Sequence, residues 1–195
     1  TEASPSAAMT GTPTRASVAP TERGGASGDA GEIDRQFIDM MVPHHQSAVA
    51  MAVVALARAE HPEIAALAPE IIEAQELEIA QLRTWREAWY GDASTPPLTA
   101  MPMLQGVMMQ GMDMASMTMD MAPQIKDLWL VEADFDKAFI DAMIPHHQSA
   151  IDAAEMALDN AEHPEIQELA QAIIDAQQRE IDEMTAWREE WYPGD

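Results

Sequence analysis

The chain has 195 residues, a formal net charge of −24, 16 methionines and no cysteine. The acidic charge argues against nucleic-acid binding, which needs a basic surface, and the lack of cysteine excludes disulfides, thiolate zinc sites and all-cysteine iron–sulfur clusters. Aromatic residues make up only 5% of the chain and long alternating apolar runs are absent, so an all-α fold is expected rather than a large sheet.

Residues 1–31 are rich in Ser, Thr, Ala, Pro and Gly, show no apolar period, and are predicted to form a disordered tether. Because the chain begins at Thr1, we interpret its start as the point where an export signal was removed. Methionine without cysteine also fits an oxidising compartment, periplasmic or extracellular. We find no stretch that approaches the roughly 20 apolar residues of a membrane span.

An internal repeat follows, in which residues 37–90 recur at 139–192 with 32 identities in 54 aligned positions. Apolar residues at helical spacing predict a hairpin of two helices in each copy. The four helices are expected at 32–59, 62–90, 134–161 and 164–192. A lone hairpin cannot bury both of its apolar stripes, so we expect the two to pack as one four-helix bundle. Two separate hairpins in a dimer are the alternative.

The expected organisation has four parts. The tether of residues 1–31 is followed by a first hairpin repeat at 32–92. A methionine-rich connector at 93–131 then leads to a second hairpin repeat at 132–195. Pro62 and Pro164 suit the first position of a helix, and Gly91 suits a helix end.

Each repeat carries Pro-His-His-Gln-Ser-Ala in its first helix. One methionine stands three residues before the first histidine of the pair and four before the second. At that spacing a thioether and an imidazole share one helix face. Adjacent histidines point about 100° apart, so we expect one of each pair to face the interior and the other a neighbouring site or solvent. Imidazole suits several metals whereas thioether selects Cu(I), so copper is predicted, with Ag(I) as its mimic. The candidate ligands are Met41, His44 and His45 in the first repeat, and Met143, His146 and His147 in the second.

Further candidates stand elsewhere in the repeats. His61 and His163 precede the prolines that open the second helices, where each could cap a turn or bind the metal. Other thioethers could either join the sites or pack in the core. These are Met40, Met51, Met156 and Met184.

The connector holds nine methionines within 21 residues. They alternate with Gly, Asp, Ser and Thr, a pattern that does not fit a core stripe, so we interpret the segment as a binder of Cu(I). Adaptable packing is the alternative. The residues are Met101, Met103, Met108, Met109, Met112, Met114, Met117, Met119 and Met121.

The motif Phe-Ile-Asp-x-Met-[Val/Ile]-Pro-His-His-Gln, followed by His-Pro-Glu-Ile and a later Trp, resembles the family named "domain of unknown function 305", which includes CopM-like periplasmic copper-binding proteins. The resemblance covers residues 32–90 and 132–192 and implies a ferritin-like bundle, export, and copper binding linked to copper tolerance. It also implies that the two sites differ. The family's later methionine is Met51 in the first repeat but Ala153 in the second, whereas Met184 of the second repeat corresponds to Leu82.

The expected function is sequestration or shuttling of Cu(I) in copper homeostasis or resistance, with Ag(I) and Cu(II) as the other candidate ions. Another copper-handling protein is a candidate partner. The alternatives are a copper-dependent oxidase, or a structural or adhesion module without a tight metal site. A di-iron oxidase is disfavoured, because no glutamate stands three residues before any histidine. We expect no enzymatic activity. Below the ordinary imidazole pKa of about 6.5, histidine-dependent sites are expected to lose metal before thioether sites do.

Overall fold

The computed structural model describes residues 30–103 and 118–194. The predicted tether, apart from its last two residues, and Met108, Met109, Met112, Met114 and Met117 lie outside these residues. Within them the protein is mostly helical, and the all-α prediction is confirmed. The helices are α1 (Ala30–Arg58), α2 (Pro62–Tyr90), α3 (Ala122–Leu130), α4 (Phe135–Asn160) and α5 (Pro164–Trp191). The four long helices begin and end within two residues of their expected bounds.

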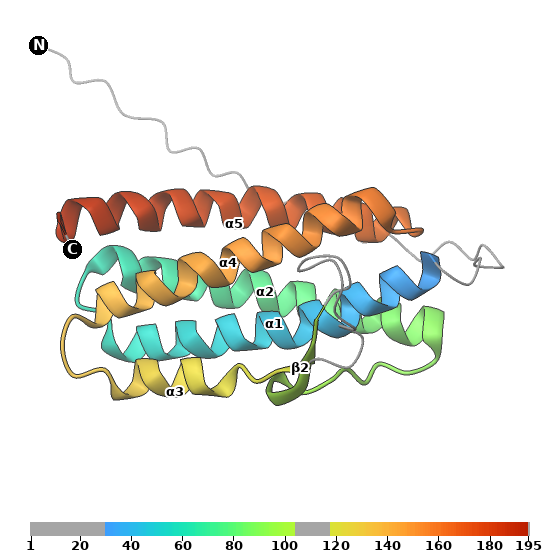
Figure 1. Ribbon diagram of the computed structural model, residues 1–195, viewed down its shortest axis with the longest axis horizontal. Helices are drawn as coiled ribbons and strands as arrows, with labels where there is room; N and C mark the ends of the chain where they lie inside the picture. Colours follow the sequence, from blue (N-terminus) through green and yellow to red (C-terminus); the bar gives the residue numbers. More distant parts are fainter. Residues whose placement is uncertain (1–29, 104–117, 195) are drawn as a thin grey trace, which may run out of the picture.

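The long helices form two hairpins, α1–α2 and α4–α5, that pack against each other mainly through α1 and α4. Figure 1 shows the four helices lying alongside one another, with the short α3 beside α1. Both hairpins of a single chain therefore complete the bundle, as the prediction of one four-helix bundle required. Several of the buried residues on α1 and α4 are alanines, and small side chains allow helix backbones to approach closely. The alanines include Ala48, Ala52, Ala150, Ala153 and Ala154.

The ends of the helices follow the local signals in the sequence. Pro62 and Pro164 each open a helix, where the missing N–H has no partner to lose. At the end of α2, Gly91 adopts a left-handed conformation with φ of 77°, and its N–H bonds to the Glu87 carbonyl. These expectations are confirmed.

Buried methionines divide between the two apolar clusters of the core. One cluster contains Met40, Met41, Met101 and Met121 beside Phe37, Leu82 and Trp85. The other contains Met51, Met143 and Met184 beside Phe135 and Phe139. The core therefore holds two separate groups of thioethers, each with members from more than one part of the chain.

The connector forms structure of its own. After the turn η1 (Leu98–Ala100), the short strand β1 (Met101–Pro102) pairs antiparallel with β2 (Thr118–Met119). This pairing brings the two ends of the methionine-rich segment together against α1.

Helix α3 lies within the connector and was not expected from the sequence. The Arg58 guanidinium at the end of α1 donates to the carbonyl oxygens of Leu128, Trp129 and Val131. A cation that satisfies the last carbonyls of a helix also opposes its negative end. The Arg58 side chain therefore ties the end of α3 to the first hairpin.

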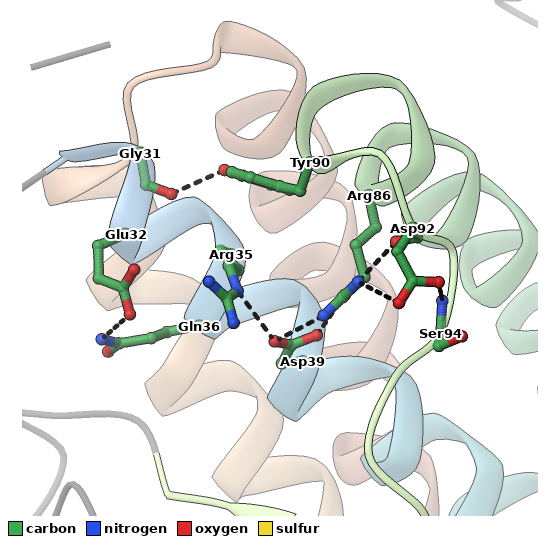
Figure 2. Close-up of polar contacts among 9 residues, drawn as sticks. All are labelled: Gly31, Glu32, Arg35, Gln36, Asp39, Arg86, Tyr90, Asp92 and Ser94. Atoms are coloured by element: carbon green, nitrogen blue, oxygen red, sulfur yellow. Dashed lines mark hydrogen bonds and ion pairs between the residues drawn. The ribbon is translucent and has the colours of Figure 1, made fainter. Parts of the chain in front are cut away.

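Polar contacts join the start of α1 to the end of α2, as Figure 2 shows. Arg86 Nε donates to Asp39 Oδ1 at 2.6 Å, and Arg86 Nη1 donates to the Asp92 carbonyl at 2.5 Å. The Tyr90 hydroxyl donates to the Gly31 carbonyl at 2.7 Å, and burial raises the pKa of this hydroxyl. These contacts set the register of α1 against α2 and so position the histidines further along α1.

Among the described residues one helix, α1 from Gly31 to Arg58, is long and apolar enough to cross a membrane by length and composition alone. It was not predicted from the sequence because its apolar residues do not form a continuous run. In the bundle, 67% of the most apolar window of α1 is buried. A helix buried in a protein core can have the same length and apolar composition as a membrane span.

Candidate metal centre

Four histidines form a row across the middle of the bundle. His44 and His45 come from α1, His146 and His147 come from α4, and all four are at most 4% exposed. The rings of His44 and His146 have centroids 3.8 Å apart, and each is 6.2–6.3 Å from its neighbour in sequence. Neither member of either pair faces solvent, because the second histidine of each pair points into its own hairpin.

Two serines bind the central histidines across the helix contact. Ser47 Oγ donates to the His44 carbonyl at 2.7 Å and lies 2.6 Å from His146 Nε2. Ser149 Oγ donates to the His146 carbonyl at 2.7 Å and lies 2.8 Å from His44 Nε2. Since a hydroxyl has a single hydrogen and here it goes to the carbonyl, each Nε2 must be the donor to the serine oxygen. The pattern assigns the proton of both central rings to Nε2.

Carboxylates take the same position beside the outer histidines. His147 Nε2 lies 2.5 Å from Glu180 Oε2 and donates to it. His45 Nε2 lies 2.7 Å from Glu78 Oε2, an ion-pair distance at which the angle does not meet that of a hydrogen bond. A carboxylate favours a proton on the nitrogen that faces it. The outer rings therefore have the same preferred tautomer as the central ones.

This tautomer leaves the Nδ1 lone pairs of all four histidines available. Each Nδ1 is buried, and none has a hydrogen-bond partner among the described residues. A buried polar atom without a partner costs about 1–3 kcal/mol. Burial first, and then the neighbouring histidines, lower the pKa of His44 and His146 well below its ordinary value. Both rings are therefore neutral at neutral pH, which is the form that binds metals.

Thioethers accompany the row of histidines. Met41 and Met143 are fully buried on the same helices, about one turn before each histidine pair. Met40, Met101 and Met121 share a cluster with Met41.

The second sulfur group lies around Met143, which shares its cluster with Met51 and Met184. Met156 is partly buried against the cluster of Met41. Two connector methionines remain outside the core, since Met103 is half-buried and Met119 is 44% exposed.

Within residues 30–103 and 118–194, no group of three or more histidine, aspartate or glutamate side chains could hold a metal ion. Structural zinc sites use four such ligands or cysteines, and calcium uses six or more oxygens. The donors that the bundle does present are imidazole nitrogens and thioethers, which suit a soft ion.

His61 and His163 lie at the turns that precede α2 and α5. The buried Asp136 carboxylate accepts from the backbone N–H groups of Glu60 and His61 at 2.7–3.1 Å and from His61 Nδ1 at 2.7 Å. The His61 ring also stacks on Trp191 with centroids 3.8 Å apart.

The other end of the bundle repeats these contacts. The Asp34 carboxylate accepts from the N–H groups of Glu162 and His163 and from the His163 ring, which stacks on Trp89. The aspartates cap these turns, and the side chains of His61 and His163 make no capping hydrogen bond to their own helices; metal binding by the two histidines stays a prediction. Each cap joins the two hairpins, because its aspartate comes from the opposite hairpin.

The sequence analysis did not single out the partners of the histidines. Ser47 and Ser149, like Glu78 and Glu180, occupy equivalent positions of the two repeats. That identity shows that both repeats have these residues but does not show that they contact the histidines. Asp34 and Asp136 are also 102 residues apart, but they precede the aligned residues 37–90 and 139–192.

Changing Asp34 and Asp136 to asparagine is expected to destabilise the protein by about 2–3 kcal/mol per site, because each carboxylate makes several charge-assisted hydrogen bonds while buried. Urea unfolding at neutral pH measures the loss. Asp175→Asn, at an exposed position, is the control and is expected to change stability by less than about 0.5 kcal/mol. A loss no larger than that of the control would show that the caps do not join the hairpins.

Comparisons with known proteins agree with this fold. The model of the family described as domain of unknown function (DUF305) matches residues 34–188. CopM in its Cu(I)-bound form has a TM-score of 0.65 and 38% identity, covering 82% of this chain and 97% of that chain. CopM in its Cu(II)-bound form has a TM-score of 0.63 and 41% identity, with the same coverage.

A curated relative is uncharacterized protein L153 of Acanthamoeba polyphaga mimivirus, 41% identical over 51 residues. That match covers 26% of this chain. The chain spans about a third (34%) of the length of the relative.

Proposed function

The chain belongs to the DUF305 family, and we propose that it binds Cu(I) as cargo in the core of its bundle, outside the cytoplasm, in order to sequester the ion or pass it on. The observation that carries the proposal is the row of four buried Nδ1 atoms that have no hydrogen-bond partner within residues 30–103 and 118–194. The CopM structures, in Cu(I)-bound, Cu(II)-bound and silver-bound forms at 36–41% identity, support copper as the ion.

The donor set favours Cu(I) over harder cations. Neutral imidazole and thioether are ligands that Cu(I) accepts, whereas magnesium and calcium need oxygen. A monovalent ion also costs less to bury than a divalent one. Glu78 and Glu180 lie at the two ends of the row and supply the negative charge that offsets the ion. Met41 and Met143 are the proposed thioether ligands of the core sites.

The connector is proposed to deliver the ion to the first of these sites. Met101 and Met121 are buried in the same cluster as Met40 and Met41, so the first and last methionines of the connector lie in the core. Met119 is exposed. Thioethers have no proton to lose, so they can accept the ion over a wide pH range and exchange it with a partner. We propose binding and transfer, with no enzymatic step.

Titration with Cu(I) against a competing chromophoric chelator, without oxygen, tests the proposal. The intact protein is compared with a variant in which the nine connector methionines are changed to leucine, which keeps their bulk and removes their sulfur. We expect the variant to bind fewer ions and to retain tight binding in the core. Ag(I) should compete for the same sites and Mg²⁺ should not. A protein that takes no Cu(I) from the chelator would overturn the function.

A further inference from the structure

An open apolar groove lies between α1 and α2 of the first hairpin. Its volume is about 510 Å³. Leu56 is 53% exposed there and Leu77 is 66% exposed, while Val53 stands one turn before Leu56 and is 47% exposed. The groove is lined by Leu56, Pro69, Ile72, Glu73, Glu76 and Leu77.

The second hairpin shows that the fold does not need an apolar side chain or proline at three of these positions. It forms the same pair of helices, yet three positions 102 residues later carry exposed polar side chains, while Leu158 and Ile174 keep the residue types of Leu56 and Ile72. The replacements are Glu155 for Val53, Gln171 for Pro69 and Arg179 for Leu77. At these three positions the first hairpin exposes an apolar residue or proline where the second exposes a polar one. Exposed apolar surface with a polar edge marks an interaction site.

The acidic residues of the groove indicate which kind of partner it could bind. Glu73 and Glu76 line it, and the whole chain has a net charge of −24. A second copy would bring the same carboxylates together, and an anionic membrane surface would be repelled in the same way. Lysine or arginine beside apolar side chains would satisfy both features of the groove.

We propose that this groove docks an amphipathic helical segment of another protein, in which apolar side chains are flanked by lysine or arginine. The apolar side chains would fill the space between Leu56, Ile72 and Leu77, as amphipathic helices do in hydrophobic grooves. The basic side chains would pair with Glu73 and Glu76. The proposal does not depend on metal binding, because the lining residues do not belong to the row of histidines or its thioethers.

A synthetic amphipathic helical peptide of leucine and lysine is the probe, measured by calorimetry and by amide chemical shifts of the full chain. The variant Val53→Glu with Leu77→Arg introduces the residues that the second hairpin carries, so it is expected to fold. We expect it to bind the peptide at least about tenfold more weakly, a loss of about 1.4 kcal/mol. The control, Glu155→Gln with Arg179→Gln, should bind as the wild type does, with shifts at the groove.

A peptide of the same composition with its leucines dispersed should bind no more tightly to the wild type than to the groove variant. Three results would each overturn the proposal. Equal peptide binding by the wild type and the groove variant would show general charge attraction only. A dimer in sedimentation that the groove variant abolishes would identify a second copy as the occupant. Groove-dependent binding to vesicles of anionic phospholipid would identify a membrane surface.

Discussion

Changing His44 and His146 together to glutamine is expected to remove most of the Cu(I) affinity of the bundle. Glutamine places an N–H donor where the Nε2–H group stood, so the contacts with Ser149 and Ser47 can persist. It has no nitrogen lone pair in the position of Nδ1. The loss should exceed the roughly 10–100-fold that removal of an outer partner of a ligand costs. Competitive titration with Cu(I), without oxygen, measures it.

A second variant distinguishes the effect of losing the imidazoles from the effect of losing the serines that bond to them. Changing Ser47 and Ser149 to alanine keeps both imidazoles but removes the oxygens that hold the proton on Nε2. The expected loss of Cu(I) affinity is about 10–100-fold, between the wild type and the glutamine variant. Wild-type affinity in the glutamine variant, with correct folding shown by circular dichroism, would place the copper outside the central pair.

The metal-free protein is expected to lose stability steeply below pH 6.5. In the folded state burial keeps the pKa of His44 and His146 well below the ordinary value, so both stay neutral. In the unfolded chain they take up protons at about pH 6.5. The unfolded state then binds more protons, and stability falls with decreasing pH until the folded-state pKa is reached. Each ring contributes about 1.4 kcal/mol per pH unit in this window.

The pair together would cost about 3 kcal/mol per pH unit, against a total stability of about 5–15 kcal/mol for a typical protein. Urea unfolding of the metal-free protein at pH values from 7 down to 5 measures this slope. The variant with glutamine at positions 44 and 146 has no imidazole there to titrate, so its slope should be shallower by that amount. Equal slopes in the two proteins would show that the central rings are protonated in the folded state.

The same burial changes an expectation drawn from the sequence. An ordinary imidazole pKa predicted loss of the histidine-dependent metal below about pH 6.5. Because the pKa values of His44 and His146 are lowered, their nitrogens remain available to the metal at more acidic pH. The structure therefore moves the expected release of Cu(I) to lower pH.

Most of the helical architecture could be predicted because its signals are local. Helical spacing of apolar residues, proline at the first position of α2 and α5, and glycine after α2 all act within a few residues. Helix α3 was not predicted because the contact that caps it is not local. It is nine residues long, and the Arg58 side chain that caps it lies some 70 residues earlier in the chain.

The sequence by itself determined the residue types that can bind a soft metal and the helix on which each lies, because a helix places residues three and four apart on one face. Only the tertiary structure decided which nitrogen of each ring is free. That choice depends on Ser47 and Ser149, which act across the contact between α1 and α4 on histidines about 100 residues away. It also depends on burial, which keeps the central rings neutral and leaves their Nδ1 atoms without partners. Neither effect leaves a periodic signal in the sequence.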